Sequence, residues 1–342
     1  MILSDLLPAL KERGADVRLL VYDETRSRYE GNLMQQQIPL LSMGCRNKYS
    51  PGIISGLHQE IARADIAHIH LSPALYQAPV ASYDLRTPLV YTVHARNSDS
   101  MLHRLMGKWA LSKYAAITVP GEAIGRQLEN WLGDDRGTRR KLRVIRDGIN
   151  LDRLANVRRA PGFGTEHRVI TMVSGFDKTK DQMTLLRALP LVTDPKVFVA
   201  FIGEGPELDA HRAYARSLGV ADRVRFLGMR DDVPSLIAGS TIGVQSSHSE
   251  VFALAALQFM GQGKPVVGSD IPGVAEIIGD PQLLYTPHDE TRLAALINHL
   301  LNDSSFYREK SESCLARSLE FSVDEMADQC MALYEELIRS AR

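Results

Sequence analysis

Short runs of β-branched and other apolar residues alternate with stretches of helical periodicity along the whole chain. In the first half, the apolar runs cover residues 17–22, 66–71, 88–93, 116–119 and 144–145. In the second half, they cover residues 169–173, 197–202, 224–227, 242–245, 265–268 and 283–285. Short buried strands that alternate with helices are typical of βαβ units. The pattern therefore predicts an α/β fold with parallel sheets.

One stretch without regular periodicity separates the two series. Residues 156–167 contain Pro161, Gly162 and Gly164, which interrupt helices and strands. With 342 residues, of which 44% are hydrophobic, the chain is long enough for two cores. We therefore expect domains at 1–160 and 161–342, and we assign the amphipathic helix predicted for 323–338 to the second domain, which it would close.

The start of the chain departs from this pattern. Residues 4–14 read directly as a helix, whereas a Rossmann-like domain begins with a strand and a Gly-rich turn. The sequence thus predicts an N-terminal sheet that lacks its usual first strand and loop, which leaves the acceptor side of the molecule less defined than the donor side.

Composition narrows the class of protein. The chain has 40 basic and 41 acidic residues, so its overall charge gives no basis for binding nucleic acid. Cys45, Cys314 and Cys330 match no metal-ligand spacing, and their odd number argues against a disulfide framework. No signal peptide and no apolar run long enough for a membrane span is evident. We expect a cytoplasmic protein, at most peripheral on the inner face of a membrane.

The richest stretch for chemistry follows the apolar run that ends at Gln245. A polar segment begins at Ser246 and leads through Glu250 to a helix predicted to start near Val251. Unpaired N–H groups at a helix N-terminus after a parallel strand suit a diphosphate. Eight helical residues would separate Glu250 from Gln258 by about 12 Å, roughly the span from a donor sugar to a ribose.

Residues 246–276 resemble, in order, the donor-binding signature of the retaining glycosyltransferase family 4, which has the GT-B fold. The resemblance continues through 173–181, 203–206, 226–228 and 231–234, and more weakly through 65–70, 92–94 and 145–150. It implies two Rossmann-like domains facing a central cleft. It also implies transfer of a hexosyl group from a UDP- or GDP-sugar to a glycan or lipid-linked acceptor, in the synthesis of a bacterial surface polysaccharide such as lipopolysaccharide, O-antigen or capsule.

The resemblance also implies roles for individual residues. Glu250 matches the carboxylate that holds the sugar hydroxyls, Gln258 matches the ribose-binding position, and Lys180 matches the lysine that neutralises the donor phosphates. His94 matches the histidine that faces the transferred sugar. The remaining positions expected to line the nucleotide are Gly175, Gly203, Val251, Phe252, Ala253 and Leu254. The resemblance implies no metal and no cofactor beyond the donor, and the sequence has no Asp-x-Asp after a strand, since Asp231 and Asp232 are adjacent.

Three positions depart from the family pattern. Gln258 stands where a carboxylate is usual, Gly175 where an arginine is usual, and Val251 where glycine is frequent. A glutamine can still hydrogen-bond a ribose hydroxyl, but without a charge. Loss of one cation beside a diphosphate lowers the rate, and Arg230 is a candidate substitute.

The roles of the histidines and the function of the whole chain each have a second possible interpretation. His94, at the end of the predicted strand 88–93, is equally a histidine satisfied by nearby backbone, and packing is the simpler role for His68. A non-catalytic nucleotide-sugar-binding or scaffold protein and a GT-B-like nucleotide-sugar epimerase stay open as alternatives. An NAD-dependent enzyme is disfavoured because no complete Gly-rich fingerprint follows a strand.

Two basic segments have two interpretations as well. Residues 101–113 form an amphipathic pattern with cations, as in helices that lie on an anionic membrane, although such a helix can also pack on its own sheet. Residues 136–146 include Arg139, Arg140, Lys141 and Arg143. This cluster suits a phospholipid or lipid diphosphate, or is a solvated surface.

Overall fold

The chain divides into two compact units. The computed structural model describes residues 2–22, 30–45, 47, 49–50, 52–94, 100–155, 157–161, 163 and 167–342. The N-terminal unit comprises Met1–Gly148 and Val323–Arg342, and the C-terminal unit comprises Ile149–Ser322. Each unit is an α/β structure with parallel strands, which confirms the fold class expected from the sequence.

A six-stranded parallel sheet forms the centre of the C-terminal unit, with the order β12-β11-β10-β7-β8-β9. Its strands are β7 (Arg168–Val173), β8 (Val197–Ile202), β9 (Val224–Phe226), β10 (Ile242–Gln245), β11 (Val266–Ser269) and β12 (Leu284–Tyr285). The chain order reverses between β7 and β10, which are neighbours. In open α/β sheets, ligands bind at the carboxyl ends of the strands beside such a reversal.

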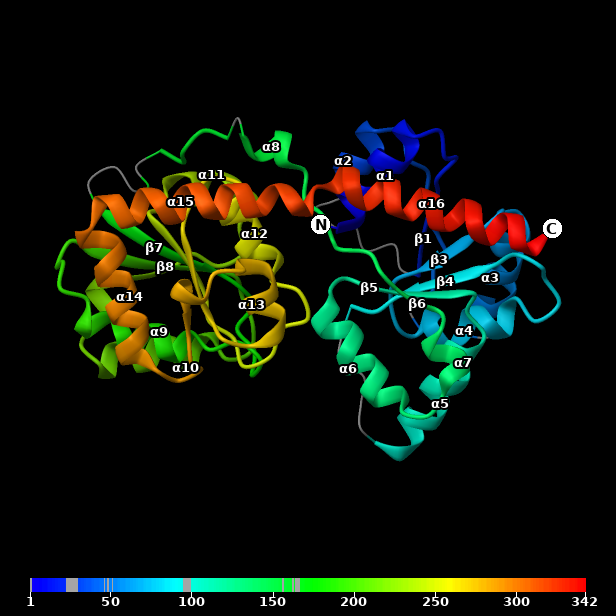
Figure 1. Ribbon diagram of the computed structural model, residues 1–342, viewed down its shortest axis with the longest axis horizontal. Helices are drawn as coiled ribbons and strands as arrows, with labels where there is room; N and C mark the ends of the chain where they lie inside the picture. The colour runs from blue at the N-terminus through cyan, green and yellow to red at the C-terminus, as the bar shows by residue number, and fades with distance from the viewer. Residues whose placement is uncertain are drawn as a thin grey trace. The chain divides into compact units, whose positions relative to one another are not determined.

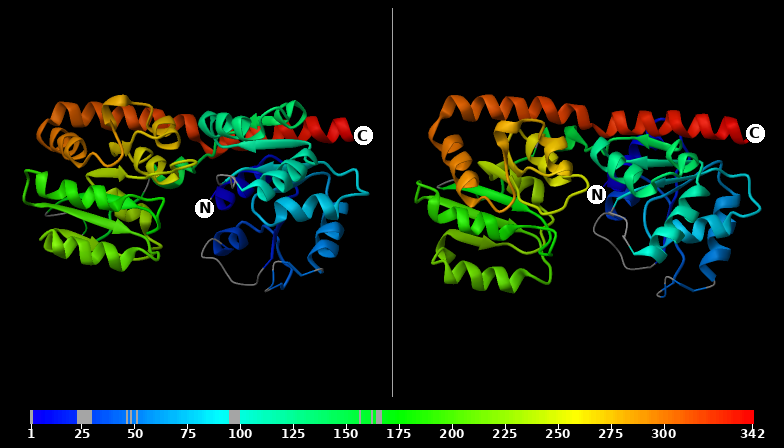
Figure 2. Two further views of the ribbon diagram at one scale, coloured as in Figure 1. Left: turned by 90° about the horizontal axis from the view of Figure 1, so that it is seen from below. Right: turned by 60° about the horizontal axis from the view of Figure 1, so that its bottom comes forward.

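Helices form two groups around this sheet (Figures 1 and 2). In one group, α9 packs on α10 and α14; in the other, α12 packs on α11, α13 and α15. The helices of the unit are α8 (Leu151–Ala155), α9 (Gln182–Ala188), α10 (Leu208–Ser217), α11 (Val233–Gly239), α12 (Leu254–Met260), α13 (Pro272–Ile278), α14 (Glu290–Asn302) and α15 (Ser304–Ser318).

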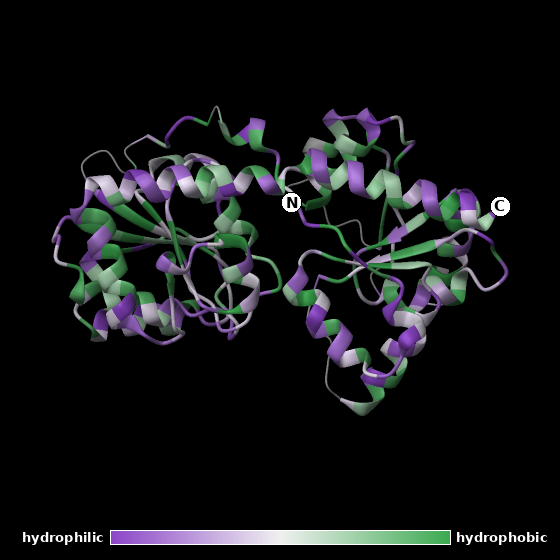
Figure 3. Ribbon diagram, in the orientation of Figure 1, coloured by the Kyte–Doolittle hydropathy of each residue, from purple (hydrophilic) through white to green (hydrophobic). Residues whose placement is uncertain are grey.

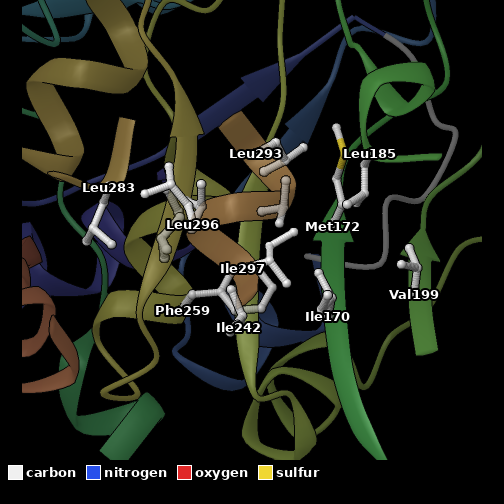
Figure 4. Close-up of a cluster of buried hydrophobic side chains, with 14 of the residues drawn as sticks. Ile170, Met172, Leu185, Val199, Ile242, Phe259, Leu283, Leu293, Leu296 and Ile297 are labelled. Atoms are coloured by element: carbon white, nitrogen blue, oxygen red, sulfur yellow. The ribbon is translucent and has the colours of Figure 1, made fainter. Parts of the chain in front are cut away.

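The core of the C-terminal unit lies between the sheet and these helices. Figure 4 shows part of it: Ile170, Met172, Val199 and Ile242 on the strands, with Leu185, Phe259, Leu283, Leu293, Leu296 and Ile297 around them. All of these side chains are buried. In Figure 3 the strands are mostly hydrophobic, whereas the surrounding helices carry both hydrophobic and hydrophilic residues. This distribution explains why the strands were recognisable as apolar runs.

The N-terminal unit holds two parallel sheets, β1-β2 and β3-β4-β5-β6. Their strands are β1 (Leu19–Val21), β2 (Leu40–Ser42), β3 (Ala67–Ile69), β4 (Leu89–Thr92), β5 (Ala116–Val119) and β6 (Leu142–Val144). The helices are α1 (Ile2–Glu12), α2 (Glu30–Gln35), α3 (Gly52–Ala62), α4 (Ala74–Ala81), α5 (Met101–Ser112), α6 (Glu122–Leu132), α7 (Arg136–Arg139) and α16 (Val323–Ala341). The chain thus begins on a helix, as the sequence predicts, and β2 is a strand that the sequence pattern missed.

The placement of α16 corrects the expected domain division. Sequence periodicity predicts this helix but assigns it to the second domain, whereas it packs on α1 in the N-terminal unit. Met326 and Leu333 share one buried cluster with Leu6 and Leu10 of α1. Arg13 then donates hydrogen bonds to the carboxylates of two aspartates of α16. The division also falls after Gly148 rather than after residue 160; Gly162 and residues 164–166 of the expected linker lie outside the described residues.

Candidate functional site

Two loops meet at the carboxyl edge of the C-terminal sheet, one after β7 and one after β10. Lys180 and Ser247 pair as an antiparallel bridge. The Asp181 amide donates to the Ser246 carbonyl at 3.1 Å, and the His248 amide donates to the Thr179 carbonyl at 2.8 Å. Because β7 and β10 are neighbours in the sheet, the segments that follow them lie side by side. Residues some 70 positions apart in the sequence are thereby held together.

Lys180 and Glu250 form an ion pair where these loops meet. Gln245 donates from Nε2 to the same carboxylate oxygen, Oε2, at 3.1 Å, and the Ser247 hydroxyl lies 3.5 Å from it. The two charged side chains are only 16% and 15% exposed. The sequence-predicted sugar carboxylate and phosphate lysine are therefore in direct contact, and one carboxylate oxygen is fixed by a cation and an amide.

Beneath Glu250, hydroxyl groups hold the loop to its neighbours. The Ser247 amide donates to Ser269 Oγ at 3.0 Å, and Ser269 Oγ donates to the Ser247 carbonyl at 2.9 Å. The Tyr285 hydroxyl donates to Ser246 Oγ at 2.6 Å. These groups are all buried, so the base of the loop is rigid. Nothing in the local pattern singled out Ser269 or Tyr285, since both act from other strands.

The helix after Glu250 starts later than the sequence predicts. Helix α12 begins at Leu254, not near Val251, so the residues from Glu250 to Ala253 are not helical. The expected helical spacing of Glu250 from Gln258 therefore does not hold. Phe252 packs edge-on against Phe321, with ring centroids 6.0 Å apart. Phe321 is distant in sequence, so the local pattern around Glu250 gives no sign of this contact.

The remaining predicted donor residues of this segment point mostly into the protein. Ala253 is buried, and Phe252 and Leu254 are partly buried against the core. Gln258 is only 6% exposed within α12. Residues 252–254 can therefore offer a ligand their backbone, while their side chains serve packing.

A tight turn after β8 completes this edge. Gly203 has a φ of +141°, and a Cβ atom there would collide with the backbone carbonyl of Ser174. Only glycine tolerates both conditions. Gln182 donates from Nε2 to Ser174 Oγ at 3.1 Å and to the Gly175 carbonyl at 2.8 Å. The sequence pattern did not predict a role for this residue. Gly203, Gly175 and Ser174 thus pack backbone against backbone.

His94 lies in the N-terminal unit, directly after β4. Its Nε2 atom is 2.9 Å from Nδ1 of His70, and the two rings are stacked. Desolvation in the surrounding protein lowers the pKa of His94 and lowers the pKa of His70 well below its ordinary value. Both imidazoles are therefore neutral at neutral pH, so one ring nitrogen donates and the other accepts.

His68 does more than pack. Its Nδ1 is 2.6 Å from the Tyr334 hydroxyl and its Nε2 is 2.6 Å from the Thr92 hydroxyl, which in turn contacts the Thr118 hydroxyl. Burial lowers the pKa of His68 to about 3. Packing alone, the simpler role expected from the sequence, is therefore an incomplete description: His68 is the centre of a partly buried hydrogen-bond chain that ties α16 to the sheet.

Comparison with known protein families decides the class. Residues 2–153 match the family described as "Glycosyltransferase Family 4", and residues 155–316 match "Glycosyl transferases group 1". The chain is a family 4-like glycosyltransferase with the GT-B fold. As such it is an enzyme that uses a nucleotide-sugar donor.

Individual relatives of the glycosyltransferase are distant. It is 24% identical over 288 residues to N-acetyl-alpha-D-glucosaminyl L-malate synthase of Bacillus anthracis, covering 80% of this chain and 75% of that one. It is 26% identical over 321 residues to phosphatidyl-myo-inositol mannosyltransferase of Mycobacterium leprae, covering 89% and 82%. It is 30% identical over 174 residues to the lipopolysaccharide core biosynthesis glycosyltransferase LpsE of Rhizobium meliloti, covering 50% and 51%.

A solved structure shares the fold of the glycosyltransferase. The crystal structure of Anabaena HepE in complex with UDP and glucose superposes with a TM-score of 0.84 at 21% identity, covering 97% of this chain and 96% of that one. None of the helices that the structure describes in the glycosyltransferase combines the length and apolar character needed to traverse a bilayer.

Arg230 of the glycosyltransferase already has an anionic partner. Its Nε and Nη2 atoms donate to the two carboxylate oxygens of Asp232, each at 2.8 Å. This bidentate pair raises the pKa of Arg230 and lowers the pKa of Asp232. Arg230 is therefore already paired with a carboxylate, as Lys180 is.

One group of side chains near the glycosyltransferase site has the composition of a metal site. Within the described parts of the chain, Asp181, His248 and His288 are the three residues whose candidate ligand atoms all lie within 4.8 Å of one another. Lys180 and Glu250 themselves are not part of this group.

Proposed function

We propose that this glycosyltransferase transfers a hexosyl group, with retention of anomeric configuration, from a UDP- or GDP-sugar to a glycan or lipid-linked acceptor during synthesis of a bacterial surface polysaccharide. The observation that carries the proposal is the Lys180–Glu250 pair at the edge of the C-terminal sheet, beside the reversal of strand order. A carboxylate that can accept sugar hydroxyls and a cation that can neutralise a leaving diphosphate are the two groups that the donor requires.

In the proposed reaction, the bond between the sugar's anomeric carbon and the diphosphate oxygen breaks while a bond to the acceptor oxygen forms on the same face. The proton of the acceptor hydroxyl passes to the departing diphosphate, so the products are a glycoside and a nucleoside diphosphate. Lys180 stabilises the charge that develops on the diphosphate. Glu250 orients the sugar through its hydroxyls, and no step draws on a metal or further cofactor.

The ion pair gives this proposal a specific feature. Without donor, Lys180 is held by Glu250, so an incoming diphosphate has to share the cation with that carboxylate. Gln245 and Ser247 keep the carboxylate in position while the lysine changes partners. The pair therefore couples the sugar end of the donor to its phosphate end.

The proposed role of His94 is to face the transferred sugar from the N-terminal unit. Because His70 occupies Nε2 of His94, the opposite ring nitrogen, Nδ1, is the one that we assign to the substrate. The names of the relatives support the acceptor class: one acts on phosphatidyl-myo-inositol, a lipid, and another belongs to lipopolysaccharide core biosynthesis.

We propose that α5 attaches the enzyme to the inner face of an anionic membrane. Its exposed apolar side chains recur on one helical face: Met101, Leu102, Leu105, Met106 and Trp109. The opposite face, with Ala110 and Leu111, is buried. Helix α7, which packs on α5, contributes exposed Arg136 and Arg139, and Arg140 follows it. An apolar face bordered by cations is the combination that binds an anionic membrane surface.

Calorimetric titration tests the donor. Purified enzyme is titrated with UDP, GDP, UDP-glucose, UDP-N-acetylglucosamine and GDP-mannose, and release of nucleoside diphosphate is then followed with the sugar nucleotide that binds. We expect one nucleotide class to bind and its sugar to be released or transferred. Binding of no nucleotide, or interconversion of the sugar nucleotide without release of diphosphate, would contradict the proposal.

Vesicle flotation tests the membrane site. We expect the enzyme to float with vesicles that contain about 30% phosphatidylglycerol, and the double variant Leu105→Glu/Trp109→Glu to stay at the bottom of the gradient. The control variant Tyr83→Glu changes an exposed aromatic residue outside α5 and should float as the wild type does. If both variants and the wild type behave alike, α5 is not the attachment surface.

A further inference from the structure

The cluster of Asp181, His248 and His288 brings together three segments at the edge of the C-terminal sheet. Asp181 caps the N-terminus of α9, His248 lies between β10 and α12, and His288 lies between β12 and α14. His248 Nε2 is 3.9 Å from Asp181 Oδ1, and His288 Nδ1 is 3.7 Å from Asp181 Oδ2. The two imidazole rings are stacked with centroids 4.6 Å apart. The three groups therefore converge although no two are neighbours in sequence.

The Asp181 carboxylate is fixed and has acceptor capacity left. It is 3% exposed, and it accepts a hydrogen bond from the Thr184 amide on Oδ1 at 3.1 Å and from the Thr184 hydroxyl on Oδ2 at 2.6 Å. Each carboxylate oxygen can accept two bonds, so each can accept one more. Arg187 donates to the same threonine hydroxyl at 2.9 Å. Such second-layer hydrogen bonds orient metal-binding carboxylates.

The geometry points to a bound ion, and we propose that Asp181, His248 and His288 bind one divalent transition-metal ion, with Zn²⁺ as the best match. Two atoms bound to one ion at about 2.0–2.2 Å lie at most about 4.4 Å apart, and both carboxylate–imidazole distances are below that limit. Two imidazoles with one carboxylate favour zinc, nickel or cobalt over Mg²⁺ and Ca²⁺, which take oxygen ligands.

His288 adds an independent indication. Its φ is +69°, a left-handed backbone conformation that a residue with a side chain rarely adopts. Glycine would adopt it without cost. The side chain is 66% exposed, and its stacking on His248 places it at the cluster rather than in the core. Binding to a metal would account for a histidine at this position.

The ion would act on the donor site without entering the reaction. Asp181 adjoins Lys180, and His248 precedes Glu250 by two residues, so an ion that joins Asp181 to His248 and His288 fastens the two loops that carry the donor-binding pair. Because the ion would bind the folded protein and not the unfolded chain, it would stabilise the folded state and raise the unfolding temperature of the protein. The inference concerns metal binding and does not depend on the proposed function.

Zinc titration of the full chain tests this site. After treatment with EDTA, the protein is titrated with ZnCl₂ by calorimetry at pH 7.5 in a buffer that does not bind metal, and its unfolding temperature is measured with and without Zn²⁺. We expect one ion per chain at micromolar or lower dissociation constant. His248→Ala and His288→Gly should each weaken binding at least tenfold and abolish the rise in unfolding temperature.

The control is His299→Ala. His299 also lies beside a carboxylate, 3.6 Å from Asp303, but among the described residues it belongs to no group of three candidate metal ligands. Its replacement should leave zinc binding unchanged. His288→Gly keeps the experiment decisive because glycine suits the left-handed backbone, so its loss of binding cannot be ascribed to misfolding. The proposal is overturned if the wild type binds no Zn²⁺ beyond what the His248→Ala/His288→Gly double variant binds.

Discussion

At the residue scale, the charged side chains assigned to the proposed donor site are paired with carboxylates or with cations. Lys180 forms an ion pair with Glu250, and Arg230 forms one with Asp232. Gly175 has no side chain that could add a charge. The sequence predicted that Lys180 and Glu250 both bind the donor, and the structure brings the two side chains into contact. It could not identify the hydrogen bond from Gln245 to Glu250, because that bond depends on a strand end facing a loop residue.

Gly175 offers a direct test of the missing cation. Its φ lies outside the left-handed region, and a Cβ atom there would meet Asp177 Oδ2 at 3.4 Å and the Glu204 carbonyl at 3.6 Å, which are ordinary contacts. A side chain therefore fits. We expect Gly175→Arg to tighten binding of the donor nucleoside diphosphate by up to about tenfold, since a charged hydrogen-bond donor is added beside the phosphates. Calorimetric titration measures the change.

The matched control is Gly175→Ala, which alters the backbone in the same way without adding charge. It should bind the nucleotide as the wild type does. Equal affinities of Gly175→Arg and Gly175→Ala would mean that residue 175 does not face the diphosphate.

Asp147 of the N-terminal unit predicts a dependence of stability on pH. Its carboxyl is buried, its Oδ1 accepts no hydrogen bond from any residue that the structure describes, and burial raises its pKa from 3.8 to about 7. The folded state binds this proton more tightly than the unfolded state, so the contribution of Asp147 to stability is fully present below about pH 4 and is lost as the pH rises through about 7. Asp147→Asn cannot lose a proton, so it removes this loss of stability with rising pH. Relative to the wild type, the variant should gain about 2–3 kcal/mol more at pH 8 than at pH 5.

Urea unfolding at the two pH values measures this gain. Asp134→Asn, a change at an exposed aspartate of the same unit, should show no pH-dependent difference from the wild type. The account of Asp147 fails if its asparagine variant follows the wild-type pH profile.

At the scale of elements, the strands and helices were largely predictable and their partners were not. Strands β5 and β10 have the bounds that their apolar runs predict, because buried parallel strands are continuous hydrophobic segments. The predicted start of α12 was wrong because the sequence of residues 251–253 is compatible with a helix, whereas in the structure Phe252 packs on Phe321. Contacts between residues far apart in sequence leave no local signal.

In the loop after β8, we expect a single added methyl group to have a large effect on the free energy of unfolding. Gly203→Ala places Cβ against the Ser174 carbonyl at a φ of +141°, so both loops have to move. We expect a loss of more than about 2 kcal/mol in the free energy of unfolding, together with weaker nucleotide binding. Urea unfolding and calorimetry measure the two effects.

Gly219→Ala separates the effect of backbone strain from the effect of a collision between the new Cβ atom and the neighbouring loop. Gly219 also has a positive φ, +70°, but a Cβ atom there meets nothing within 4 Å. Its alanine variant should lose about 1 kcal/mol and keep its nucleotide affinity. If Gly203→Ala proves no worse than Gly219→Ala, the close approach of the two loops is not required.

At the scale of the whole molecule, the chain crosses between its units twice. The sequence predicted two α/β domains, and each unit has its own buried core. It did not predict that α16 returns to the N-terminal unit, since an amphipathic pattern shows that a helix packs but not against what. The contacts that place α16 there include the ion pair of Arg13 with Asp328 and the hydrogen bond between His68 and Tyr334. These contacts join residues far apart in sequence, so they are visible only in the folded structure.

The central claim, that Glu250 with Lys180 forms the donor site, is tested most directly by Glu250→Gln. The variant keeps the shape of the side chain and removes its charge. With the sugar nucleotide that the enzyme binds, we predict that kcat/KM for release of nucleoside diphosphate falls at least about 10²-fold, while circular dichroism stays as in the wild type. Glu312→Gln, at an exposed position of α15, should leave the rate unchanged. A rate for Glu250→Gln within about twofold of the wild type would contradict the account, because no other carboxylate was assigned to the donor sugar.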